Sequence, residues 1–326
     1  MHPAFSVIFL TTLIGAGQGL FLALATVELY GAFDLLPAAD GRRFYAAGSA
    51  VVLALLALGL VASIFHLGRP ERGWRAASRW RTSWLSREII ALPAFMGAVF
   101  LYGVVHWFGW QAPGVAVTQT LTLTPSIALA IVGSVLAFTL FVCTGMIYAC
   151  IKFLQEWASP LTVINYILLG GASGFTLAAA FAAVAEPAQT GFLGAWALIL
   201  TVLALVFRAA SLVRNARLKP KSTLQTAIGV KHPRVVQKAQ GFMGGSFNTR
   251  EFFHGKPREL LRAVKWGFLA AAFAIPLVLL WIGVPRGSAG LLLAAFLVQY
   301  AGLLAERWFF FAQANHPQNL YYQAIA

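Results

Sequence analysis

The chain has 326 residues, of which 60% are apolar and 10% are charged, with a formal net charge of +14 and a mean hydropathy of +0.77. This composition excludes a soluble globular domain and is typical of a polytopic membrane protein. The positive charge does not indicate nucleic-acid binding, because the basic residues gather in a few segments between apolar runs.

Eight apolar runs are long enough to cross a membrane, for which a helix needs about 20 mostly apolar residues. They are continuously apolar rather than alternating, which favours helices over barrel strands. The runs are 5–33, 44–66, 88–108, 126–152, 162–186, 190–208, 264–284 and 287–310. The first run has no lysine or arginine ahead of it and no small-residue cleavage site. We therefore do not expect it to be a removable signal. We therefore predict an all-α protein, with residues 1–326 forming a single bundle of eight transmembrane helices.

The basic residues indicate how this bundle lies in its membrane. An eight-helix count places 21 of the 24 lysines and arginines on the side that holds both termini, and Arg42, Arg43 and Arg286 on the other. Loops rich in lysine and arginine stay in the cytoplasm. We therefore predict cytoplasmic termini and a multi-pass protein of the bacterial inner (cytoplasmic) membrane.

Two segments on the predicted cytoplasmic side are more than plain turns. Residues 68–87 combine six arginines with Trp74, Trp80 and Trp84, a mixture that suits a segment lying in the membrane interface. Residues 211–263 carry eleven basic side chains and several phenylalanines. Loops of that length are uncommon unless they are functional or disordered. We predict a docking surface for a partner there, with a mobile basic linker as the alternative.

Histidines and cysteines give little support for a metal or haem site in this chain. Only His66 and His106 fall at helix positions, and they lie at opposite ends of their helices, so they cannot bind one haem iron. Cys143 and Cys150 are the only cysteines and lack metal-ligand spacing. We predict no metal, haem or iron–sulfur cluster in this chain, and interpret His106, beside Trp107, as a residue of the interfacial aromatic belt.

The cytoplasmic ends of the second and third helices hold the strongest candidate site. His66 ends one helix and Glu88 begins the next, so a loop folded along the interface brings both to one depth. A histidine with a pKa near about 6.5 and a partly buried carboxylate can pass protons to a quinone. The alternatives are an interfacial histidine bonded to backbone and a carboxylate favoured at a helix N-terminus. We predict that His66 and Glu88 are catalytic, with Arg72 and Arg79 close by.

Two further residues are candidates for the same site. Gln18 lies about 20 Å into the first helix among glycines, where its amide must find a partner. It either lines a channel for the quinone or locks two helices together. Arg307 ends the last helix beside Glu306. It either closes the same pocket or forms a local ion pair.

The block around His66 and Glu88 resembles the dimethyl-sulfoxide-reductase membrane-anchor family, the haem-free eight-helix subunits of complex iron–sulfur molybdoenzymes. The shared residues are Ala62, Ser63, His66, Leu67, Gly68, Pro70, Arg72, Arg79, Ser83, Leu85, Ser86, Glu88 and Ile89, with Gln18 and Arg307 also similar. The resemblance implies that Gln18, His66, Gly68, Arg72, Arg79, Glu88 and Arg307 bind ubiquinone or menaquinone. It also implies two partners on the cytoplasmic side: an iron–sulfur subunit with [4Fe-4S] clusters and a catalytic subunit with molybdopterin guanine dinucleotide.

Within this family, the cytoplasmic position of the histidine block and the long basic loop look like the branch that serves cytoplasmic sulfite-oxidising molybdoenzymes. Residues 226–233 and 241–248 are similar to segments typical of that branch. The resemblance implies electron flow from sulfite, through the iron–sulfur subunit, to a membrane quinone. One alternative is the anchor of a quinol-oxidising sulfoxide or polysulfide reductase. A secondary transporter is a second alternative, for which broken helices and charges near the bilayer centre are expected.

Overall fold

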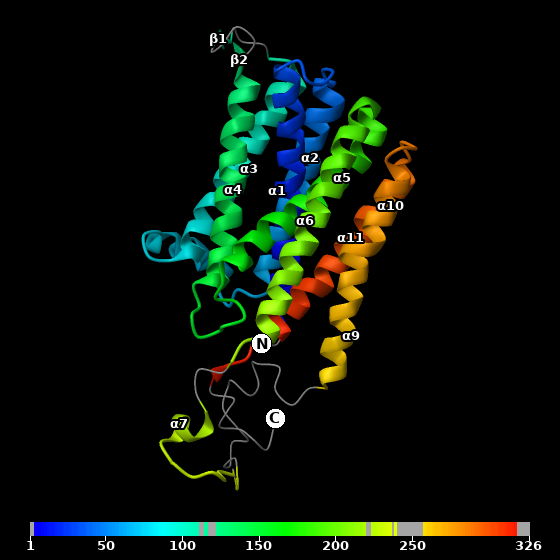
Figure 1. The fold of residues 1–326 in the computed structure, drawn as a ribbon. Helices are drawn as coiled ribbons and strands as arrows, with labels where there is room; N and C mark the ends of the chain where they lie inside the picture. The colour runs from blue at the N-terminus through cyan, green and yellow to red at the C-terminus, as the bar shows by residue number, and fades with distance from the viewer. Residues whose placement is uncertain are drawn as a thin grey trace.

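The computed structural model describes residues 3–110, 114–116, 122–219, 223–236, 238–239 and 257–317, which form a bundle of long helices (Figure 1). Eight segments among these residues are long and apolar enough to cross a membrane. The predicted all-α fold with eight membrane helices is confirmed in this respect. Strands are limited, in the described part of the chain, to a short antiparallel pair, β1 (Val115–Ala116) and β2 (Thr122–Leu123).

The helices follow the apolar runs closely. The first six crossings are α1 (Phe5–Ala32), α2 (Ala47–Ile64) after the π-helix η1 (Gly41–Ala46), α3 (Trp84–Phe108), α4 (Pro125–Ala149), α5 (Pro160–Ala185) and α6 (Thr190–Ala216) after the 3-10 turn η3 (Pro187–Gln189). The seventh is α9 (Arg258–Leu269), continued by the π-helix η4 (Ala270–Ala274) and α10 (Ile275–Gly283), and the eighth is α11 (Ala289–Ala312). The 3-10 helix η2 (Pro70–Arg79) and α7 (Leu224–Ile228) lie outside the bundle.

Capping side chains fix several helix starts. The hydroxyls of Ser83, Thr124, Ser159 and Ser288 accept hydrogen bonds from backbone N–H groups in the first turns of α3, α4, α5 and α11. These N–H groups have no partner within the helix, so a side-chain acceptor stabilises the start. The cap at Ser83 starts α3 at Trp84, four residues before the predicted beginning at Glu88. Glu88 therefore lies one turn inside the helix.

Helices α1 and α5 form the centre of the bundle and are its most buried crossings. They approach closely where Gly19 faces Gly170 and Gly174, since a Cβ atom on Gly19 or Gly174 would overlap the backbone of the other helix. Small residues allow such close contact between membrane helices. The seam brings the polar residues of both helices to the middle of the bundle.

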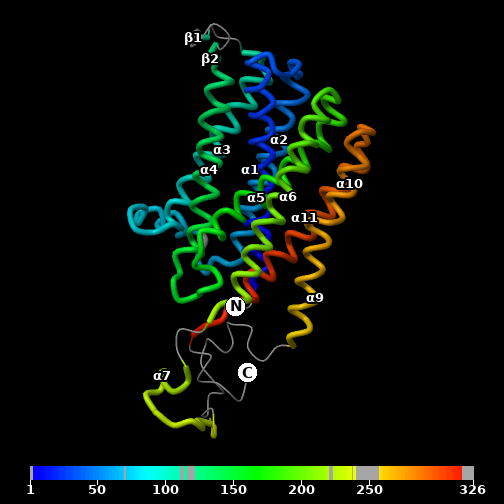
Figure 2. The backbone as a smooth tube through the Cα atoms, in the orientation of Figure 1, coloured from blue at the N-terminus to red at the C-terminus, as the bar shows by residue number. Residues whose placement is uncertain are grey.

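We call the end at which α2 stops and α3 starts the basic end. It carries the arginines of residues 68–87 together with Arg214, Arg217 and Lys219 at the end of α6. The chain trace in Figure 2 shows η2 projecting sideways from the bundle at this end. Trp74 and Trp80 of this segment are exposed, and Arg75 and Arg81 stack over their rings at 5.6 and 4.9 Å.

The two predicted loops are partly helical. Residues 84–87 belong to α3, and the start of the segment 211–263 continues α6 to Ala216 while its end already belongs to α9. Only 211–219, 223–236, 238–239 and 257–263 of this segment are described. The segment 241–248 that carried part of the family resemblance lies outside the described residues. The interfacial role of residues 68–87 and the docking role of residues 211–263 stay predictions.

Candidate functional site

A polar cavity lies in the half of the bundle nearest the basic end, where α1, α3, α4, α5 and α11 meet. It is lined by Thr11, Thr12, Ile14, Gly15, Gln18, Glu88, Phe141, Thr144, Tyr166, Leu169, Gly170, Ser173, Leu303 and Arg307. The space that the centre of a water molecule can reach is about 20 Å³, room for about one water. A carboxylate, an amide, a guanidinium and several hydroxyls thus face one narrow space between apolar walls.

Glu88 reaches the cavity from the second turn of α3. The hydroxyl of Thr144, on α4, donates a hydrogen bond of 2.5 Å to Oε1 of Glu88. This bond holds the carboxyl group in one orientation between two helices. Thr144 was not predicted from the sequence, where it is one hydroxyl in a long apolar run.

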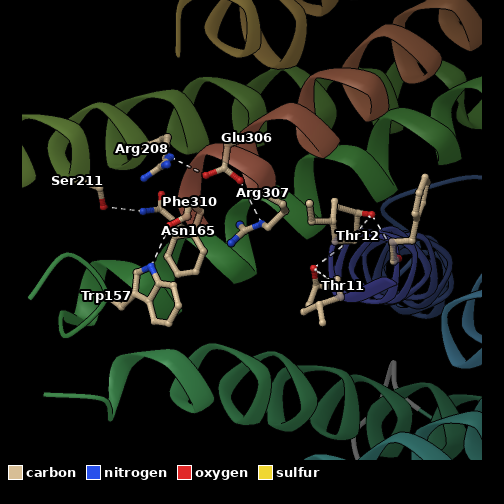
Figure 3. Close-up of polar contacts among 12 residues, drawn as sticks. Thr11, Thr12, Trp157, Asn165, Arg208, Ser211, Glu306, Arg307 and Phe310 are labelled. Carbon is tan, nitrogen blue, oxygen red and sulfur yellow. Dashed lines mark hydrogen bonds and ion pairs between the residues drawn. The ribbon is translucent and has the colours of Figure 1, made fainter. Parts of the chain in front are cut away.

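Arg307 reaches the cavity from α11 and is almost fully buried, with 4% of its surface exposed. Its Nε lies 3.1 Å from Oε2 of Glu306 (Figure 3). Its guanidinium lies 3.9 Å from the ring centre of Tyr166 on α5. The two alternatives for Arg307 are therefore compatible, because it pairs with Glu306 and also lines the pocket.

Glu306 has a second cationic partner, Arg208 of α6. Arg208 Nε lies 2.7 Å from Oε1 of Glu306, and the exposed fractions of the two residues are 2% and 1% (Figure 3). The rings of Phe268 and Phe309 cover the guanidinium at 5.5 and 5.9 Å. Charges in a membrane interior are costly, and those that persist are paired and often functional. We call Arg208, Glu306 and Arg307 the buried charge triad.

Arg208 was missed because the predicted sixth run ends at residue 208, which puts this arginine at the end of the helix rather than within it. The signal was present: the apolar pattern continues through Ala209, Ala210, Leu212 and Val213. Helix α6 accordingly extends to Ala216. An arginine inside such a run lies within the helix, so it must face another helix rather than lipid.

Gln18 is 2% exposed and lines the cavity from α1. Its Nε2 donates a hydrogen bond of 2.8 Å to the carbonyl oxygen of Ala137 on α4. The residue thus does both things that were left open, since it joins two helices and contributes to the cavity wall.

The other predicted site residues lie at the surface of the basic end. His66, Gly68, Arg72 and Arg79 are exposed, and none of them lines the cavity. Partial burial lowers the pKa of His66 below its usual value. Arg72 lies 3.8 Å from its neighbour Glu71. The structure therefore brings Gln18, Glu88 and Arg307 together and leaves His66 outside their cavity.

His106 differs from its interpretation as a belt residue. At the opposite end of α3 its Nε2 lies 3.4 Å from Oε1 of Glu28, and 12% of its side chain is exposed. The rings of Tyr45 and Tyr102 contact it at centroid distances of 4.4 and 4.6 Å. His106 is thus part of a buried cluster, whereas Trp107 and Trp110 are exposed as expected of belt residues.

Among the described residues, no group of three or more histidine, cysteine or carboxylate side chains could hold a metal ion. Cys143 is buried and Cys150 is exposed, and both are free thiols. The chemistry of the cavity is therefore that of its carboxyl, guanidinium, amide and hydroxyl groups.

Comparison with known proteins agrees with this architecture. The model of the DMSO reductase anchor subunit (DmsC) family matches residues 1–313. The chain is 58% identical over 326 residues, the full length of both proteins, to the C subunit of sulfite dehydrogenase from Allochromatium vinosum. It is also 29% identical to the C chain of anaerobic dimethyl sulfoxide reductase from Haemophilus influenzae over 127 residues, 39% of this chain and 42% of that protein. The predicted resemblance is confirmed: this multi-pass membrane protein belongs to the family of DMSO reductase anchor subunits.

Proposed function

We propose that this chain is the membrane anchor and quinone-reducing subunit of a sulfite-oxidising molybdoenzyme complex. The full-length similarity to the C subunit of a sulfite dehydrogenase supports the sulfite-oxidising assignment. The assignment of a quinone site is supported by one observation, the cavity that Glu88, Gln18 and Arg307 line together. Such an anchor functions only with other subunits, which supply the electrons.

The cavity has the groups that a quinone head requires. A bound quinone supplies two-electron chemistry and takes up two protons for each pair of electrons. Arg307 and the hydroxyl of Tyr166 are donors that can hold a carbonyl oxygen on one side, and Glu88 can give a proton on the other. Since a quinone ring is larger than the space present, we expect lining side chains such as Leu303 and Phe141 to move when it binds.

In this proposal the exposed residues of the basic end serve the entrance to the site. His66 exchanges protons with water there, because an imidazole titrates near physiological pH and this one is accessible. Gly68, Arg72 and Arg79 line the surface over which the quinone or the electron-donating subunit approaches.

The basic end faces the cytoplasm in this proposal, with both termini on that side of the bacterial cytoplasmic membrane. An iron–sulfur subunit with [4Fe-4S] clusters docks there and receives electrons from a molybdopterin-guanine-dinucleotide subunit that oxidises sulfite. Protons and electrons then reach ubiquinone or menaquinone from the same side.

Purification of the affinity-tagged chain from its own membranes tests this assignment. We expect co-purified subunits that contain iron and molybdenum, detected by mass spectrometry and metal analysis, and reduction of a short-chain quinone when sulfite is added. Quinol-dependent reduction of a sulfoxide without sulfite oxidation would instead support the quinol-oxidising alternative, which the Haemophilus relative represents. A chain that purifies alone and shows neither activity would contradict the proposal.

A further inference from the structure

Buried polar side chains extend from the cavity toward the basic end along α5, α6 and α11 (Figure 3). On α6, Arg208, Ser211 and Asn215 follow a spacing of three and four residues, which places them on one face of the helix. That face meets α5, where Nδ2 of Asn165 donates a hydrogen bond of 2.8 Å to the hydroxyl of Ser211. We call Arg208, Ser211 and Asn215 of α6, together with Asn165 and its neighbour Tyr166 of α5, the polar strip.

Two buried atoms of this strip have no hydrogen-bond partner among the residues that the structure describes. They are Oδ1 of Asn165 and a terminal nitrogen of Arg208, on side chains that are 4% and 2% exposed. Leaving such an atom unsatisfied costs about 1–3 kcal/mol. Buried water commonly bridges about three polar groups of this kind. Neighbouring donors and acceptors on α5 and α6 are therefore suited to hold water.

The strip reaches both the cavity and the surface. At one end Tyr166 and Arg307 line the cavity. At the other, Arg214 donates to the carbonyl oxygens of Gln155 and Ala158, and Asn215 donates to that of Glu156. These acceptors belong to the segment between α4 and α5, outside the membrane spans. Burial raises the pKa of the Glu156 carboxyl group, so it holds a proton to higher pH than an exposed glutamate.

We propose that Asn165, Ser211 and Arg208, with bound water, form a proton pathway that enters beside Asn215 and reaches the cavity at Tyr166 and Arg307. This inference rests on the proposed quinone-reducing function. When Glu88 gives its proton to the quinone, a proton from the pathway replaces it, and none is taken from the opposite side of the membrane.

The charges of the site suit this role. The buried charge triad carries one net positive charge, because Glu306 offsets one of its two arginines. An ionised Glu88 across the cavity brings the sum to zero. The site that has just lost its proton is therefore neutral, and an incoming proton restores a single positive charge rather than building up a second one.

Asn165→Leu and Ser211→Ala in the purified complex test the pathway, with Thr176→Val as the matched control. Thr176 is a buried hydroxyl of α5 that bonds only within its own helix, to the carbonyl of Ala172, and lies away from the strip. Sulfite-dependent quinone reduction is measured in H₂O and D₂O. A second readout is the rate at which D₂O shifts the infrared carboxyl band that Glu88→Gln removes.

We expect the two pathway variants to lower kcat about tenfold, less than the loss of the proton donor Glu88 itself, with KM for quinone unchanged. The solvent isotope effect should rise and deuterium exchange at Glu88 should slow, while Thr176→Val matches the wild type. Unchanged kcat and exchange in both pathway variants would overturn the pathway. Ser211→Ala removes a single oxygen, so it keeps the test valid if Asn165→Leu does not assemble. If Glu88→Gln retains full quinone reduction, the cavity is not the site of protonation; if the wild-type complex reduces no quinone with sulfite, the proposed function itself fails instead.

Discussion

Replacing Glu88 by glutamine is expected to lower sulfite-dependent quinone reduction by about 10²–10⁴-fold, the usual contribution of a general acid. Glutamine keeps the size of the side chain and an oxygen that can accept the hydrogen bond of Thr144, so the cavity is preserved. It has no proton to give. Steady-state kinetics of the purified complex with a short-chain quinone measures the loss.

Two other variants make this result specific. Glu71→Gln removes an exposed glutamate at the same end of the bundle and should leave the rate unchanged. His66→Ala should cost less than about tenfold, since an exposed imidazole that only exchanges protons with water can be replaced by buffer. Reduction of an artificial dye by the partner subunits should stay normal in all three. A larger loss with His66→Ala than with Glu88→Gln would mean that the cavity is not the site of protonation.

Glu306→Ala is expected to destabilise the protein by about 3–5 kcal/mol, the typical cost of removing one partner of a buried ion pair. The carboxylate lies 2.7 Å from Arg208 and 3.1 Å from Arg307, so its removal leaves two buried guanidinium groups without a counter-charge. Thermal unfolding of the purified complex in detergent measures the change, with Glu259→Ala, an exposed glutamate at the start of α9, as the control.

Adding Arg208→Met to Glu306→Ala should recover part of that loss, because it removes one of the two uncompensated charges. The difference between the double variant and the sum of the single variants then gives the coupling between the two residues. If Glu306→Ala unfolds at the same temperature as Glu259→Ala, the triad is not a buried charged group.

The number of helices followed from the sequence because a membrane span needs a long apolar run, and each run is visible by itself. Helix ends were less accurate, since they depend on caps and on residues that are polar yet buried. The cap at Ser83 moved the start of α3, and the buried Arg208 concealed two further turns of α6.

The site could be predicted only in part. Gln18, Glu88 and Arg307 were identified because a polar side chain within or at the end of an apolar run requires a partner. His66 was predicted to share a site with Glu88 because a loop folded along the interface brings both to one depth. Segment η2 does project sideways from the bundle, but His66 is exposed and does not line the cavity. The roles of Thr144 and Tyr166 depend on which helices meet, which no single run reveals.

Photolabelling the complex with an azido-substituted quinone shows whether the quinone binds in the cavity. We expect the label on peptides that line the cavity, above all those containing Thr144 or Tyr166, and we expect excess unlabelled quinone to prevent labelling. A label that is prevented by competing quinone but found only on peptides remote from the cavity would contradict a quinone site formed by Gln18, Glu88 and Arg307.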